Sequence, residues 1–142
     1  MYILDTNIIS EIRKGVRCDE RVQRWLQATT DEEVFTSVLV IAELRRGIGM
    51  LVGKDSTQAK ALKEWLTDLC ARFGERILPV DLKVAEVWAD INVTRRYPVV
   101  DGLLAATALA RDAILVTRNA ADIAGTKVRF LNPFETTRIR RA

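Results

Sequence analysis

The chain has 142 residues, of which 49% are apolar and 29% are charged, with a formal net charge of +3 and no histidine. This length and composition fit one globular domain with a single core, and so small a positive charge favours a polyanionic partner only weakly. The absence of histidine excludes Ser-His-Asp catalysis, Cys-His catalysis and histidine-bound zinc, so any acid–base or metal chemistry must use carboxylates.

The first seven residues predict a buried strand that ends in polar side chains. An apolar run at positions 2–4 leads directly into Asp5, Thr6 and Asn7. Such a run suits a strand that is covered on both faces, and ligands of open α/β sheets bind beyond the carboxyl ends of the strands. Asp5 therefore stands where a site is expected. The isoleucines that follow have helical spacing, so the simpler alternative is that Asp5 or Asn7 only caps a helix.

The segment from residue 21 to residue 81 predicts two strands around a helical hairpin. A short helix over residues 21–28 precedes an apolar strand at 34–36, and Ser37 is expected to cap the next helix. Glu43 lies near the start of that helix, about a quarter turn from the centre of its apolar stripe at ~100° per residue. The alternative for Glu43 is an ordinary solvated glutamate. A second helix begins at residue 56. The strand at 77–81 contains Pro79, which predicts a sheet edge or the end of a strand, and Asp81 is expected to cap the helix that follows.

The last third of the chain predicts a buried helix and two more strands. Asp101 opens the alanine-rich segment 103–110, where the helix dipole favours an anion. The strand at 113–117 ends near Thr117 and leads to Asp122, and a further strand covers 128–131. Strands that alternate with helices indicate an α/β fold with a mainly parallel sheet. We assign residues 1–134 to one domain and residues 135–142 to a basic tail without predicted structure.

The acids are expected to converge, because the loops after parallel strands emerge at one end of a sheet. Each like-charged pair would cost about 3–4 kcal/mol at about 4–5 Å with an effective dielectric of 20. A divalent cation removes this cost, and oxygen ligands without histidine or thiolate select Mg²⁺ or Mn²⁺ over zinc. Magnesium held by few carboxylates keeps positions for water and a phosphate oxygen, the arrangement used in metal-assisted phosphodiester hydrolysis.

Five segments of the chain carry a family resemblance: 2–11 (YILDTNIISE), 37–47 (SVLVIAELRRG), 76–81 (RILPVD), 101–108 (DGLLAATA) and 117–119 (TRN). In this order and spacing they resemble the motifs of PIN-domain ribonucleases, and most closely those of the VapC/FitB-like toxins of bacterial toxin–antitoxin pairs. The resemblance implies a PIN-like three-layer sandwich, in which a mainly parallel central sheet of about five strands is flanked by helices.

The resemblance also implies a Mg²⁺- or Mn²⁺-dependent endoribonuclease. Its metal would be held, and its attacking water activated, by Asp5, Glu43 and Asp101. The fourth family acid often stands at the position of Asn119, so either Asp122 takes over that charge or Asp122 is a solvated loop acid. The groups expected to orient the carboxylates are Thr6, Asn7, Thr117 and Asn119. The implied partners are an RNA substrate, an antitoxin protein and a second copy of the chain.

Two other functions remain open from the residues alone. A haloacid-dehalogenase-like phosphatase would need a second aspartate at position 7, where this chain has Asn7. A receiver-like or binding module would need paired acids at the end of the first strand and a lysine after the last, and it gives Glu43 no role. An antitoxin is expected to cover surplus apolar side chains on the helical hairpin, namely Leu39, Met50, Leu51 and Trp65.

We expect a cytoplasmic protein with reduced thiols. No apolar run approaches the ~20 residues of a membrane span, and Asp5 interrupts any signal-peptide core. Cys18 and Cys70 lie far apart without a metal-ligand pattern.

Overall fold

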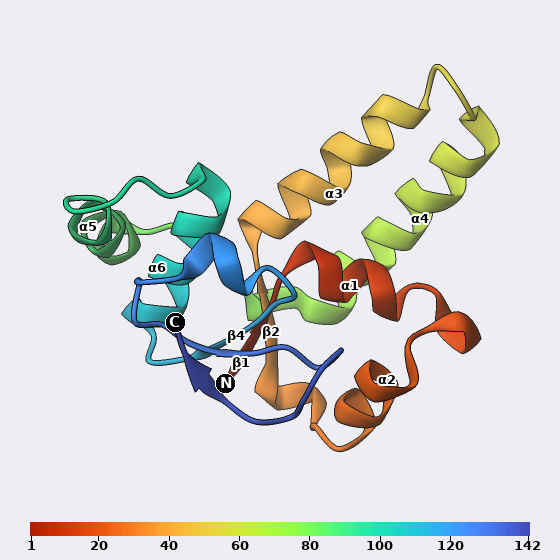
Figure 1. Ribbon diagram of the computed structural model, residues 1–142. Coiled ribbons are helices and arrows are strands. Elements are labelled where there is room, and N and C mark those ends of the chain that lie inside the picture. Colours follow the sequence, from red (N-terminus) through yellow and green to blue (C-terminus); the bar gives the residue numbers. More distant parts are fainter.

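The computed structural model describes residues 1–142 as a six-stranded sheet flanked by helices (Figure 1). In sheet order the strands are β3 (Ile77–Leu78), β2 (Val34–Ser37), β1 (Tyr2–Leu4), β4 (Ile114–Val116), β5 (Arg129–Leu131) and β6 (Arg140–Arg141). The pairs from β3 to β5 are all parallel, and β6 runs antiparallel to β5. The expected α/β class and mainly parallel sheet are confirmed, with one short strand more than the five expected.

The helices fall into two groups that cover opposite faces of the sheet. The connections from β1 to β3 contain α1 (Thr6–Ile12), α2 (Glu20–Gln27), α3 (Val38–Leu51) and α4 (Ser56–Phe73), and the connection from β3 to β4 contains α5 (Leu82–Ile91) and α6 (Val99–Ala110). Parallel crossovers are right-handed, so helices change face where the chain reverses direction across the sheet. Figure 1 shows α5 and α6 on the left and α1, α2 and α4 on the right. The strand order reverses between β1 and β4, and such a switch point is where ligands bind in open α/β sheets.

The core is centred on these two strands. Ile3 and Leu115 are at most 1% exposed, and the alanine-rich α6 packs against the same cluster through Leu104, Ala105 and Ala108. The small alanine side chains let α6 lie close to the sheet. The carboxyl ends of β1 and β4 are thus held firmly by buried apolar contacts on both faces.

Local sequence signals placed the starts of α3 and α5 correctly, whereas α6 begins at Val99, two residues before the expected Asp101. Ser37 caps α3 by accepting a hydrogen bond from the amide of Leu39 at 3.2 Å, and Asp81 caps α5 by accepting one from Val84 at 3.0 Å. Pro79 follows β3, which lies at an edge of the sheet as expected. These features confirm three predictions that depend only on neighbouring residues.

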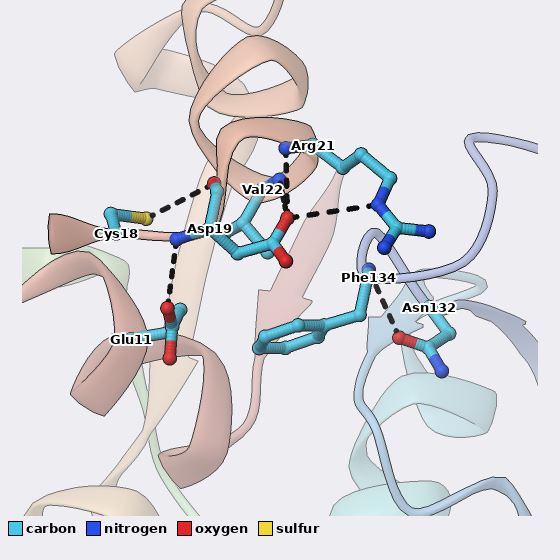
Figure 2. A network of polar contacts seen from close by, with 7 residues as sticks. All are labelled: Glu11, Cys18, Asp19, Arg21, Val22, Asn132 and Phe134. Carbon is cyan, nitrogen blue, oxygen red and sulfur yellow. Dashed lines mark hydrogen bonds and ion pairs between the residues drawn. The ribbon is translucent and has the colours of Figure 1, made fainter.

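A buried carboxylate, which the sequence did not reveal, joins α1 to α2. Glu11 is 7% exposed, and its side chain accepts hydrogen bonds from the Asp19 amide at 2.8 Å and from Lys14 Nζ at 2.6 Å. These two bonds hold the pKa of Glu11 below its usual value, and the bond from Lys14 has the larger effect. Asp19 in turn caps α2 at the amide of Arg21 (Figure 2). The turn between the two helices is therefore fixed at both ends.

The C-terminal residues add an element where the sequence predicted none. Arg140–Arg141 pairs with β5, and the bond from the Ala142 amide to the Val128 carbonyl, 2.9 Å long, extends this pairing. Without β6 the parallel sheet would end in an open strand edge at β5. The Arg140 guanidinium also lies 5.0 Å from the centre of the Phe130 ring.

The hairpin of α3 and α4 displays less apolar surface than expected. Met50 is 62% exposed, whereas Leu39, Leu51 and Trp65 are half-buried against the two apolar clusters of the protein. Cys18 and Cys70 are free thiols. None of the helices combines the length and hydropathy needed to cross a membrane.

Candidate metal centre

Asp5 lies at the carboxyl end of β1 and is held by three hydrogen bonds. One carboxylate oxygen accepts the Thr6 amide at 2.7 Å, and the other accepts Thr117 Oγ1 at 2.7 Å and Asn7 Nδ2 at 2.8 Å. The side chain is 4% exposed. Burial raises the pKa of Asp5 against the opposing effect of these bonds, and nearby Glu43 raises it further. Asp5 does occupy the N-cap of α1, but the bond from Thr117 ties it to a second strand as well.

Glu43 reaches the same place from the first half of α3. Thr6 Oγ1 donates a hydrogen bond to Glu43 Oε2, which joins the start of α1 to α3. Glu43 itself is exposed. A carboxylate that is solvated and yet oriented by a hydroxyl is available to a ligand entering from outside.

Asp101 lies in the first turn of α6, on the opposite face of the sheet from α3. Its pKa is raised to about 6, first by burial and then by the negative charges of Asp5, Asp122 and Glu43. The effect of a charge on a pKa weakens with distance, so these contributions indicate that the acids lie toward the same end of the sheet. Asp122 is exposed on the short turn after β4.

The polar groups between these acids form a connected network. Asn7 Oδ1 accepts the Arg118 amide at 3.2 Å, and Thr117 Oγ1 accepts the Asn119 amide at 3.0 Å. The Asn119 side chain is exposed, and the contact of this residue with the network is made by its backbone. Thr6, Asn7 and Thr117 thus form hydrogen bonds with the carboxylates directly. Asn119 is connected to them only through its bond to Thr117.

The donor set fits a hard divalent cation. It consists of carboxylate, hydroxyl and amide oxygens, and its concentrated negative charge is compensated by no lysine or arginine ion pair to any of the four acids. No three carboxylates lie close enough together to enclose an ion directly. Mg²⁺ is commonly held by one or two carboxylates and otherwise by water, so water would have to supply its remaining ligands here.

One aromatic neighbour of this centre was not predicted. The Arg118 guanidinium lies 4.3 Å from the centre of the Phe134 ring, on the loop that follows β5. The two residues are far apart in sequence, and only the pairing of β4 with β5 brings them together. Arg118 forms no ion pair with the acids and joins their network through its backbone amide.

Comparison with known proteins gives concordant matches over nearly the whole chain. Residues 2–124 match the family model described as PIN domain. The chain is 33% identical over 141 residues to Toxin FitB of Neisseria gonorrhoeae, covering 94% of this chain and 99% of that protein. It is also 33% identical over 141 residues to VapC ribonuclease Y4jK of Sinorhizobium fredii, covering 95% and 99%. The crystal structure of FitAcB from Neisseria gonorrhoeae superposes with a TM-score of 0.87 at 32% identity, covering 96% of this chain and 100% of that one.

Proposed function

Because this chain belongs to the PIN domain family, we propose that it is a metal-dependent endoribonuclease that serves as the toxin of a toxin–antitoxin pair. The observation that supports the proposal is that Thr6 links Asp5 to Glu43 and that the charges of Asp5, Asp122 and Glu43 raise the pKa of Asp101, near the switch point of the sheet. The named activities of the similar proteins, a toxin and a ribonuclease, agree with it. Neither a phosphatase nor a receiver-like module accounts for this set of acids from four separate elements.

Dependence on a divalent metal is typical of the family, and we propose that the ion is Mg²⁺, with Mn²⁺ as a substitute. The residues that would hold it are Asp5, Glu43 and Asp101, at most two of them directly and the rest through water, with Asp122 adding charge through water. When bound, such an ion polarises a phosphodiester oxygen and lowers the pKa of bound water. The all-oxygen donor set supports this choice, because thiolate and imidazole ligands would favour zinc.

The protein's own side chains would divide the work according to their surroundings. Asp5 is immobilised by Thr117 and Asn7, so it is suited to a fixed ligand. Glu43 is exposed and oriented by Thr6, so it is suited to accept a proton from the attacking water at the open side. Asp101 has a pKa of about 6 without the ion, partly because neighbouring carboxylates repel its negative charge. A bound cation would offset this repulsion and favour the deprotonated form of Asp101.

The partner part of the proposal is an antitoxin protein and a second copy of this chain. An arginine of the antitoxin that reached Asp5 and Asp101 would form charge-assisted hydrogen bonds and compete with the metal. The exposed Met50 on α3 supports a contact with the partner at the hairpin. Because the proposed substrate is RNA, the proposal places the protein in the cytoplasm.

The test of the proposed function is cleavage of RNA by the purified chain with Mg²⁺, with Mn²⁺ and with EDTA. Asp5→Asn should abolish cleavage, because an amide is a poor ligand for a hard cation. Asp68→Asn is the control, since Asp68 is an exposed acid in the middle of α4. Cleavage that persists in EDTA, or that survives in Asp5→Asn, would refute the proposal. Release of phosphate from a monoester without RNA cleavage would point to the phosphatase instead.

A further inference from the structure

A second hollow, outside the metal centre, opens between α2 and the loop that follows β5. Its volume is about 620 Å³, within the range of about 300–1,000 Å³ usual for sites that bind small molecules. Polar side chains from three parts of the chain line it, chiefly Tyr2, Arg21, Arg24, Thr29, Thr136 and Thr137.

The hollow carries positive charge that the protein itself does not neutralise. Arg24 takes part in no ion pair, and Arg21 approaches only Asp19, at 3.9 Å, whose carboxylate is committed to the cap of α2. The acid on the wall of the hollow, Glu135, is bound by Arg140 at 3.0 Å. Two guanidinium groups one helical turn apart are therefore left facing an open polar space.

The threonines add hydrogen-bond donors to this charge. Thr136 Oγ1 accepts the Arg138 amide at 3.1 Å, so its own O–H is free to donate. Arginine and hydroxyl donors together are the groups that contact phosphate oxygens in nucleic-acid complexes. Tyr2 packs edge-on against Trp25 with ring centres 5.5 Å apart, and this pair gives the hollow an aromatic wall.

A series of contacts links the hollow to the metal centre through Pro133, which lines the hollow, and the neighbouring Phe134. Its middle is the loop of Asn132 and Phe134, which is fixed by a 3.2 Å hydrogen bond from the Phe134 amide to Asn132 Oδ1. Figure 2 shows Arg21 extending from the start of α2 toward this loop. The Arg118 guanidinium lies over the Phe134 ring, and the amide of Arg118 is bound to Asn7 of the centre.

We propose that this hollow is a second RNA-binding site, in which Arg21 and Arg24 bind backbone phosphates of the strand that runs out of the metal centre over Arg118 and Phe134. The inference rests on the proposed function, since it names the route of the same substrate. From Tyr2 to Asp5, β1 spans about 10 Å at about 3.3 Å per residue. Because Tyr2 lines the hollow, its nearest wall lies at a distance from the centre that a few stacked nucleotides, at about 3.4 Å each, would cover.

The test measures binding of a single-stranded oligouridylate, longer than the ~4–16 nucleotides that single-strand binders occupy, by fluorescence anisotropy in EDTA over a series of salt concentrations. Each phosphate contact contributes about 0.7 to the slope of log K against log salt on a single strand. Arg21→Ala with Arg24→Ala should therefore reduce the magnitude of the slope by about 1.4. Between 50 and 200 mM salt the unsubstituted protein should then lose about sevenfold more affinity than the variant.

The matched control is Lys60→Ala with Lys63→Ala, which removes two charges at the same spacing from an exposed face of α4. This variant should keep the slope, and Arg21→Lys with Arg24→Lys should restore most of it. An unchanged slope in the double alanine variant of α2, or an equal loss in both alanine variants, would overturn the inference. The inference would also be overturned if the double alanine variant of α2 lost binding to a polyglutamate peptide but still bound RNA. That result would assign the hollow to an acidic protein segment.

The measurement requires no cleavage, so its result separates the two proposals. A chain that binds RNA through Arg21 and Arg24 but hydrolyses none would refute the proposed function and retain the second site. A chain that hydrolyses RNA with an unchanged salt slope in the α2 variant would do the reverse.

Discussion

Replacing Asp101 by asparagine is expected to stabilise the metal-free protein. Its pKa of about 6, against the usual 3.8, means that between these values the folded state binds more protons than the unfolded chain. The free energy of unfolding therefore falls as the pH rises from about 4 to about 6, and the loss is complete above that range. Asparagine keeps the shape of the side chain and removes the charge that Asp5, Glu43 and Asp122 repel.

The size of the effect follows from the shift in pKa. A carboxyl whose pKa is raised from 3.8 to about 6 would cost about 3 kcal/mol of stability at pH 7 if it were fully buried. Asp101 is only half-buried, and solvent screening reduces this to about 1 kcal/mol. For a chain of this length we expect Asp101→Asn to raise the Tm in EDTA by about 3 °C at pH 7. At pH 5 the gain should be about half as large, because Asp101 is then mostly protonated in the folded protein.

Thermal melts with EDTA and with Mg²⁺ at both pH values check this reasoning. Magnesium at about 100 times its Kd should stabilise the unsubstituted protein by about 2.7 kcal/mol, and should stabilise Asp101→Asn much less. Asp90→Asn is the control, because Asp90 is exposed on α5 and should respond like the unsubstituted protein. A lower Tm for Asp101→Asn in EDTA at pH 7, or an equal response to Mg²⁺, would refute the shared acidic site.

Three further predictions concern groups around that site. Asp122→Ala should lower the rate of RNA cleavage by tens-fold, and adding Asn119→Asp should restore part of it; full activity in Asp122→Ala would reduce the site to three acids. Thr117→Val removes the 2.7 Å bond to Asp5 and should lower the free energy of unfolding, measured by chemical denaturation, by about 1–3 kcal/mol. It should also move the acid limb of the pH profile of cleavage to higher pH, whereas Thr117→Ser should retain the stability and the pH profile. Deleting residues 140–142 exposes the edge of β5 and should lower the Tm and promote aggregation, measured by light scattering; an unchanged melt would show that β6 contributes nothing.

Local patterns in the sequence were enough for most of the fold. The alternation of apolar strands with helices indicated the α/β class, and Ser37 and Asp81 marked helix starts, because capping depends on residues two or three positions apart. The apolar run before Asp5 placed that acid at the end of a central strand. The absence of histidine by itself limited the metal chemistry to carboxylates and other oxygen donors.

The tertiary structure decided everything that depends on which strands are neighbours. Thr117 binds Asp5 across 112 positions, and Arg118 meets Phe134, only because β4 lies between β1 and β5. No local pattern encodes that order. The raised pKa of Asp101 has the same origin, since burial and the charges of three distant acids set it. Sequence therefore determined which groups this protein has for its chemistry, and long-range packing determined their distances, their hydrogen bonds and their protonation.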